Sequence, residues 1–146
     1  RFVSVAQVQG HANGAGFQLA LACDLRVVAD DVKFCMKEPA LGLVPDLTGT
    51  KPLAELVGYS RALEICATAR VVLADEAREL GLATAVVPVA DLAATTADLT
   101  QAILANTAGA VRETKGLLRS ATGTDLEHQR LLERQAQLRR FRELIA

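Results

Sequence analysis

The residues best placed to do chemistry lie around a glycine-rich turn near the start of the sequence. Gly10, Gly14 and Gly16 follow an apolar run that is typical of a buried strand, and they precede residues 17–22, which are good helix formers. Glycines just before a helix let the backbone pass close to a ligand and leave the N–H groups of the first helical turn free. Such N–H groups stabilise negative charge, so we expect this turn to bind an oxyanion.

A dinucleotide-binding loop and a simple packing turn are the two alternatives for this segment. Residues 14–19 follow the pattern G-x-G-x-x, but leucine stands where a dinucleotide loop has glycine or alanine. Asp30 and Asp31 also lie closer to the turn than the about 20 residues that separate such a loop from its ribose-binding acid. A single glycine cluster does not separate an oxyanion site from a packing turn, so the rest of the sequence has to decide.

An ordered set of motifs around and beyond this turn resembles the crotonase superfamily, the enoyl-CoA hydratases and isomerases. The resemblance runs without a large gap from about residue 5 to about residue 105 and continues more weakly to the end. The matching residues, in chain order, are Gly10-His-Ala-Asn-Gly-Ala-Gly16, Leu19-Ala20, Cys23-Asp24-Leu25-Arg26, Phe34, Glu38, Leu41-Gly-Leu-Val-Pro-Asp46, Val57-Gly58, Ala62, Glu64, Ala69-Arg70, Ala74, Glu76-Ala77, Gly81-Leu82 and Val86-Val87-Pro88.

The resemblance implies that the turn stabilises a thioester enolate. The oxyanion of such an enolate needs two N–H donors, each worth about 3 kcal/mol of barrier, and the donor assigned here is the backbone N–H of Ala15. The family usually has glycine at this position, but alanine keeps the N–H, so the role survives where the local φ suits a residue with a Cβ. By the same register, the substrate-binding residues are Ala12, Asn13, Gly14, Gly16, Gln18 and Leu43.

The resemblance also places a pair of carboxylates, which enoyl-CoA hydratases use to hold the attacking water. Gln18 occupies the first position, and an amide can hold a water but cannot take its proton. Glu38 occupies the second position, where the isomerases of the family need one base to move a proton between two carbons. The resemblance therefore implies catalysis by Glu38 and favours isomerisation over hydration. A surface carboxylate beside Lys33 and Lys37 is the non-catalytic alternative.

Asp46 is a second candidate catalytic residue. Its register, eight residues after Glu38, matches the aspartate that works with a glutamate in dienoyl-CoA isomerases, and also the nucleophilic aspartate of the 4-chlorobenzoyl-CoA dehalogenases. The low aromatic content weakens the dehalogenase alternative, which needs aromatic walls. Asp46 is equally well suited to cap the following turn through the N–H of Thr48 or Gly49.

These residues must be positioned by short strands and helices that alternate along the chain. The patterns predict a loop over residues 39–52 and a helix capped by Ser60 that runs through Cys66. Strands are predicted over 2–8, 25–29, 32–36, 71–73 and 83–87, and further helices over 16–22, 52–57, 74–80, 91–103, 110–120 and beyond Gly123. The fold class is α/β, and the resemblance implies a crotonase-type spiral of repeated strand-strand-helix units followed by a helical C-terminal tail.

The resemblance divides the chain into residues 1–90, the later part of the spiral core, and residues 91–146, a helical trimerisation region. It implies a further region before Arg1 that supplies the second oxyanion donor. Residues 112–146 hold eight Lys and Arg against five Asp and Glu, while the first 111 residues hold eight against twelve. Leu131, Leu138 and Ile145 share one face of the last helix with Phe141, which suits packing against a neighbouring subunit of a homotrimer or hexamer.

The composition of the chain argues against several other classes of protein. The 146 residues fit one domain and are 51% apolar, while a net charge of −1 and 3% aromatic residues give no case for nucleic-acid binding. No apolar run approaches the about 20 residues that span a bilayer. Cys23, Cys35 and Cys66 indicate reduced core thiols of a cytoplasmic protein. The resemblance implies that His11 is a spacer beside the acyl chain, and we expect no metal and no cofactor beyond the CoA of the substrate.

Together these observations predict an enzyme that stabilises the enolate of an acyl-CoA thioester, with double-bond isomerisation favoured. Glu38 is the predicted base, Asp46 a possible partner and the N–H of Ala15 half of the oxyanion hole. Two alternatives remain: a 2-enoyl-CoA hydratase with an altered glutamate pair, and a non-catalytic acyl-CoA-binding or assembly subunit. Gln18 is the residue that motivates both.

Overall fold

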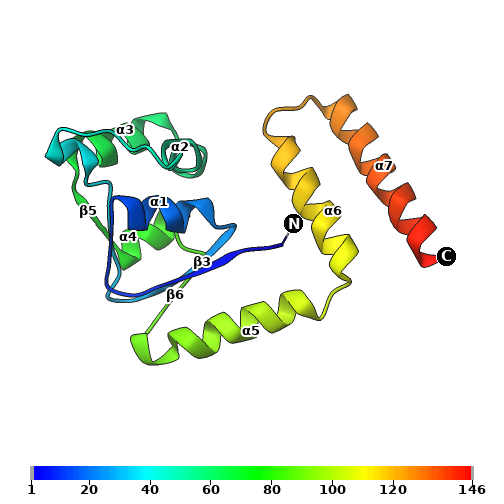
Figure 1. Ribbon diagram of the computed structural model, residues 1–146, viewed down its shortest axis with the longest axis horizontal. Coiled ribbons are helices and arrows are strands. Elements are labelled where there is room, and N and C mark those ends of the chain that lie inside the picture. Colours follow the sequence, from blue (N-terminus) through cyan, green and yellow to red (C-terminus); the bar gives the residue numbers. More distant parts are fainter. Residues whose placement is uncertain (1, 146) are drawn as a thin grey trace. The chain divides into compact units, whose positions relative to one another are not determined.

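The computed structural model describes residues 2–145. The chain forms two compact units, which are treated separately: residues 4–99, and residues 100–145 together with residues 2–3. Figure 1 follows the chain from strands and short helices in blue to green into the long helices in yellow to red. The mixed α/β character and the helical C-terminal part agree with the sequence-based prediction.

Two small sheets organise the first unit. One contains β1 (Val5–Val8), β3 (Leu25–Ala29) and β6 (Ala85–Val87), in the order β1-β3-β6 with all pairs parallel. The other contains β2 (His11–Asn13), β4 (Lys33–Cys35) and β5 (Val71–Leu73), with β4 parallel to β2 and antiparallel to β5. The chain passes from the first sheet to the second twice, through β1 then β2 and through β3 then β4, which is the predicted repetition.

Helices follow each of these passages. α1 (Ala15–Ala22) comes after β2, and a 3-10 helix, η1 (Glu38–Leu41), comes after β4. The helices α2 (Thr50–Val57), α3 (Tyr59–Thr68), α4 (Ala74–Glu79) and the 3-10 helix η2 (Val89–Asp91) complete the unit, and α5 (Leu92–Leu104) begins in it.

Several sequence-based boundaries differ from the structure; the loop predicted over residues 39–52, for example, contains most of η1 and the start of α2. The strand predicted over residues 2–8 begins only at Val5, and the turn predicted between Gly10 and Gly14 contains β2, which exists because it pairs with β4. The prediction that Ser60 caps the next helix was wrong. Gly58, at φ 77°, ends α2 and begins α3, so the helix starts two residues earlier than a Ser60 cap requires.

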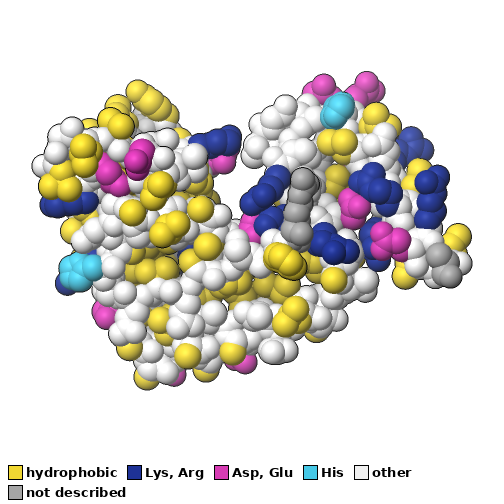
Figure 2. Space-filling view, in the orientation of Figure 1, with side chains coloured by type: hydrophobic (Ala, Val, Ile, Leu, Met, Phe, Trp, Pro, Cys, Tyr) yellow, Lys and Arg dark blue, Asp and Glu magenta, His cyan; other side chains and the backbone are white. Residues whose placement is uncertain are grey.

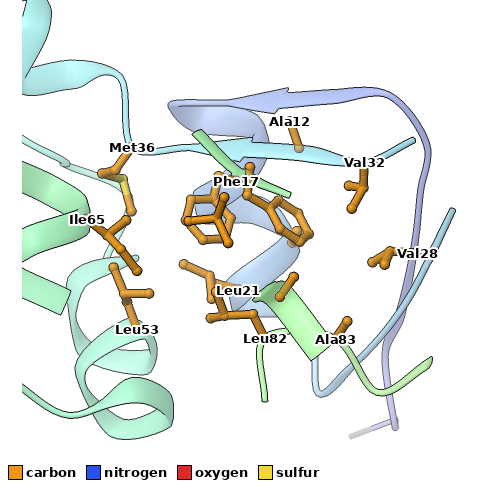
Figure 3. Packing of buried hydrophobic residues seen from close by; sticks show 14 of the residues in the cluster. Ala12, Phe17, Leu21, Val28, Val32, Met36, Leu53, Ile65, Leu82 and Ala83 are labelled. Carbon is orange, nitrogen blue, oxygen red and sulfur yellow. The ribbon is translucent and has the colours of Figure 1, made fainter. Parts of the chain in front are cut away.

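The core of the first unit is built where α1 meets β4. Phe17 and Phe34 are fully buried and stack with their ring centroids 4.6 Å apart. Figure 3 shows Leu21, Leu53 and Ile65 pointing into the same interior as Phe17. Each fully buried side chain of this size contributes about 1.5–3 kcal/mol. The packing therefore fixes the position of α1, whose N-terminus holds the glycine turn.

An ion-pair cluster joins three further elements of this unit. Arg70 is the residue directly before β5. Its guanidinium pairs with Glu64 on α3 at 2.5 Å and with Glu76 on α4 at 2.6 Å. Hydrogen bonds from Arg70 lower the pKa of Glu64 and of Glu76 below the ordinary value of a glutamate. The cluster therefore joins the middle of α3 and the first turn of α4 to the residue that precedes β5.

The second unit contains α6 (Ala108–Ala121) and α7 (Leu126–Leu144). Arg139 of α7 forms a two-pronged ion pair with Glu113 of α6, and the guanidinium of Arg140 lies directly against Gly109. Figure 2 shows Lys and Arg side chains gathered over these two helices. Among the described residues of this unit, only Gly109 and Ala136 are buried, so it has little apolar core of its own.

Within residues 2–145, no helix is long and apolar enough to cross a membrane. The same described part of the chain contains no group of three or more His, Cys, Asp or Glu side chains that could hold a metal ion. Cys23, Cys35 and Cys66 are all free thiols.

Candidate active site at the glycine turn

The glycine turn ends β2 and starts α1. Gly14 adopts φ 51° and ψ −116°, a conformation that favours glycine, and its N–H donates to the carbonyl of Cys35 on β4 at 2.8 Å. Its carbonyl accepts from the N–H of Gln18 at 3.0 Å, which closes the first turn of α1. The turn is therefore fixed on one side to a strand and on the other to a helix.

Ala15 is the first residue of α1, and its N–H has no hydrogen-bond partner among the described residues. Its φ is not positive, so alanine fits this position without strain. The residue is exposed, and an N–H in the first turn of a helix carries part of the positive end of the helix dipole. This N–H can donate to a negatively charged oxygen.

Glu38 follows β4 and begins η1. Its Oε1 accepts a hydrogen bond from Nε2 of Gln18 at 2.6 Å and lies 3.1 Å from the point that a Cβ on Gly14 would occupy. Its Oε2 is buried and has no hydrogen-bond partner in the described structure. The carboxylate thus lies against the glycine turn, one residue away from the N–H of Ala15, and no ion pair joins it to Lys33 or Lys37 within residues 2–145.

Gln18 occupies the second turn of α1 and is completely buried. Its Nε2 donates to Glu38, and its Oε1 accepts from the N–H of Leu47 at 2.9 Å and from the N–H of Gly49 at 3.3 Å. A buried amide needs such partners because an unpaired polar group costs about 1–3 kcal/mol. Gln18 therefore joins the carboxylate to the loop that follows η1.

That loop runs through residues 42–49 and carries Asp46. The Asp46 side chain is exposed and accepts no hydrogen bond from the described residues, since the N–H of Gly49 donates to Gln18 instead. Thr48 adopts φ 65°, which is rare for a β-branched residue. Asp46 thus lies next to Leu47, which is hydrogen-bonded to the site, but its own carboxylate faces outward.

The other predicted site residues are distributed around the turn. Ala12 is buried in the middle of β2, Asn13 is exposed at the end of that strand, and Gly16 lies in the first turn of α1. Leu43 is 60% exposed on the loop after η1, and His11 is exposed at the start of β2. Sequence reasoning missed the N–H of Leu47 and considered the N–H of Gly49 only as a partner of Asp46, whereas both donate to Gln18.

Cys66 of α3 lies close enough to respond to the charge of Glu38. Burial, and to a smaller extent the negative charge of Glu38, raise the pKa of the Cys66 thiol above its ordinary value. A thiol with a raised pKa stays protonated at neutral pH and is a poor nucleophile. Cys66 is therefore a poor candidate for a nucleophile beside this turn.

Comparisons with known proteins identify the family of the chain. The profile of the family described as "Enoyl-CoA hydratase/isomerase" matches residues 1–144. The chain belongs to the enoyl-CoA hydratase/isomerase family. A short-chain-enoyl-CoA hydratase from Clostridioides difficile is 38% identical to this family member over 124 residues, which cover 85% of the chain and 79% of that protein. A crotonyl-CoA hydratase from Syntrophomonas wolfei is 36% identical over 132 residues, covering 90% of the chain and 51% of that protein.

Solved structures of related proteins have the same fold as this chain. An enoyl-CoA hydratase homologue from Thermobifida fusca YX is 56% identical to the chain in two ligand complexes. Its complex with CoA has a TM-score of 0.97 and covers 99% of the chain and 56% of that protein. Its complex with acetoacetyl-CoA has a TM-score of 0.96, with 97% and 56% covered. The chain thus has the crotonase fold and spans about half the length of most relatives that it matches.

Proposed function

We propose that this family member binds an acyl-CoA thioester and shifts a double bond along its acyl chain. The structural relatives that were solved with CoA and with acetoacetyl-CoA support a thioester ligand. The observation that carries the proposal is the position of Glu38, whose Oε2 is buried without a partner while its Oε1 lies against Gly14. A base and an oxyanion donor thereby adjoin the same turn.

The proposed reaction needs one proton to leave a carbon and return to another. The thioester oxygen accepts a hydrogen bond from the N–H of Ala15, which stabilises the negative charge that develops on it. Oε2 of Glu38 takes the proton as the C–H bond breaks, and the electron pair moves into the enolate. The same oxygen returns the proton to a carbon further along the chain, and the double bond has moved with no change in composition.

Hydration fits the residues less well. The attacking water of a two-carboxylate hydratase requires a second carboxylate, and residue 18 is an amide that cannot take a proton. The Oε1 atom of Gln18 already accepts two backbone hydrogen bonds, from Leu47 and Gly49. Hydration remains the second candidate because the sequence relatives are named hydratases. Asp46 has no step in the proposed reaction, since one oxygen of Glu38 both removes and returns the proton and the Asp46 side chain is exposed.

The test compares isomerisation of a 3-enoyl-CoA with hydration of a 2-enoyl-CoA by the purified protein. We expect isomerisation, and we expect Glu38→Gln to lower its kcat by about 10²- to 10⁴-fold while acyl-CoA binding persists. Glu55→Gln, on the exposed side of α2, is the matched control and should leave kcat unchanged. Isomerisation that survives Glu38→Gln would refute the role of this residue.

Two other results would redirect the proposal. Hydration faster than isomerisation, raised further by Gln18→Glu, would establish the hydratase alternative. Binding of CoA esters with no turnover of either substrate would establish a non-catalytic binding or assembly subunit.

A further inference from the structure

All the polar atoms of the Gln18 side chain are used inside the protein. The amide connects a carboxylate on η1 with two backbone N–H groups in the loop before α2, and the side chain is fully buried. These partners lie 20, 29 and 31 residues away in the sequence. A residue chosen only to fill space at this point would be apolar, because an apolar side chain needs no partners.

The orientation of the amide follows from its partners. The N–H groups of Leu47 and Gly49 can only donate, so they require the oxygen of Gln18. The carboxylate of Glu38, when ionised, can only accept, so it requires the nitrogen. A glutamate in this place would bring two carboxyl oxygens to within hydrogen-bond distance, which is stable only while they share a proton.

Two glycines allow the neighbouring backbone to close on this pair. A Cβ on Gly49 would stand 2.6 Å from Cγ of Gln18, and a Cβ on Gly14 would stand 3.1 Å from Oε1 of Glu38. Any larger residue at position 49 would therefore push against the amide. The side chains of Gln18 and Glu38 are held between the loop on one side and the glycine turn on the other.

We infer that Gln18 is a positioning residue that holds Oε1 of Glu38 through its Nε2 and leaves Oε2 as the single oxygen that moves the proton. The same amide fixes the loop at Leu47 and Gly49, so one side chain sets both the carboxylate and the chain segment next to Asp46. This role rests on the proposed function of Glu38, because a positioned base matters only where a proton is transferred.

Three variants of the complete chain test this role. Gln18→Leu removes both the donor and the acceptor, and Gln18→Glu keeps the acceptor for Leu47 and Gly49 while its carboxyl donates only when protonated. Gln7→Leu, on the exposed side of β1, is the matched control. Because Gln18→Glu keeps the bonds to the loop, it tests the role even where Gln18→Leu fails to fold.

We expect Gln18→Leu to lower kcat for 3-enoyl-CoA isomerisation by about 10- to 100-fold, with KM changed less than about threefold. Gln18→Glu should approach the parental kcat at low pH and lose activity as the pH rises, because its carboxyl then loses the proton that bonds to Oε1. The parent and Gln7→Leu should lack this loss.

Contrary outcomes distinguish a failure of the positioning role of Gln18 from a failure of the proposed function. A parental pH profile and kcat in Gln18→Glu, or a parental kcat in folded Gln18→Leu, would overturn the positioning role and leave the proposed function standing. No turnover by the parent itself would overturn the proposed function, and the role of Gln18 with it.

Discussion

At the scale of single residues, the site depends on how closely backbone and side chains approach one another. Gly49 shows this most clearly, because its φ of −63° suits any amino acid and only the space around it requires glycine. The side chain of Gln18 fills the volume that a Cβ would need. Residue 49 is therefore restricted by packing and not by backbone conformation.

Gly49→Ala should destabilise the first unit by about 1–3 kcal/mol, because the added methyl group overlaps Cγ of Gln18 in a packed interior. Urea denaturation followed by the fluorescence of Tyr59, the single tyrosine of the chain, reports on this unit. Gly16→Ala is the control, since its Cβ would meet only Ala12 at 3.9 Å. Equal stability of the two variants would contradict the close contact.

The sequence could predict part of this site. The glycine turn and Glu38 were placed by the register of their motifs, and the structure brings them together. The contacts of Gln18 with Leu47 and Gly49 could not be predicted, because they depend on the path of a loop about 30 residues away. Residue spacing along one element carries no information about such a contact.

At the scale of elements, pairing between distant segments determines which short segments form strands where the local sequence pattern gives no clear signal. β3 has the predicted bounds, Leu25–Ala29, because a run of buried apolar residues in a parallel sheet gives a strong signal. β2 has three residues of which only Ala12 is buried, so its pattern is too short to predict. It is a strand because β4 supplies hydrogen-bond partners.

The Arg70 cluster gives a prediction for the elements that it joins. The pKa values of Glu64 and Glu76 are lowered by Arg70, so their contribution to stability is present above the pKa of an unfolded glutamate, about 4.3, and is lost as the pH falls through the lower folded values. Arg70→Met should therefore lower the urea midpoint at pH 7, and the difference from the parent should shrink below about pH 4.3.

The control for this experiment is Arg78→Met on α4, whose partner Asp75 lies 3.6 Å away and is 90% exposed. Such an exposed pair contributes about 0–1 kcal/mol, so its midpoint should stay near that of the parent at both pH values. A difference between parent and Arg70→Met that stays constant from pH 7 to pH 3 would show that packing, and not charge, gives Arg70 its effect.

At the scale of the whole molecule, the two units differ in how much apolar surface they bury. The first contains a continuous core around Phe17 and Phe34. In the second, Leu131, Leu138, Phe141 and Ile145 are all at least half exposed, although the sequence places them on one helix face. A homotrimer or hexamer that would cover this face stays a prediction, which light scattering can test.

Hydrogen exchange should separate the two units. At concentrations where the protein is monomeric, we expect amides of α6 and α7 to exchange faster than those of α1 and β3, because few buried contacts oppose local opening of these helices. Mass spectrometry of peptides from each region measures this. Equal protection of all four elements in the monomer would contradict the difference in core size.

The unpaired Oε2 atom of Glu38 is unfavourable for the stability of the fold but favourable for proton transfer. Oε2 has no hydrogen-bond donor among the described residues, and a buried polar atom left unpaired in a folded protein costs about 1–3 kcal/mol in general. A hydroxyl or amide placed beside it would relieve that burden and, by occupying the lone pair, would blunt the atom as a proton acceptor. Selection for a sturdier protein and selection for a faster one would therefore act in opposite directions on the neighbours of this one oxygen.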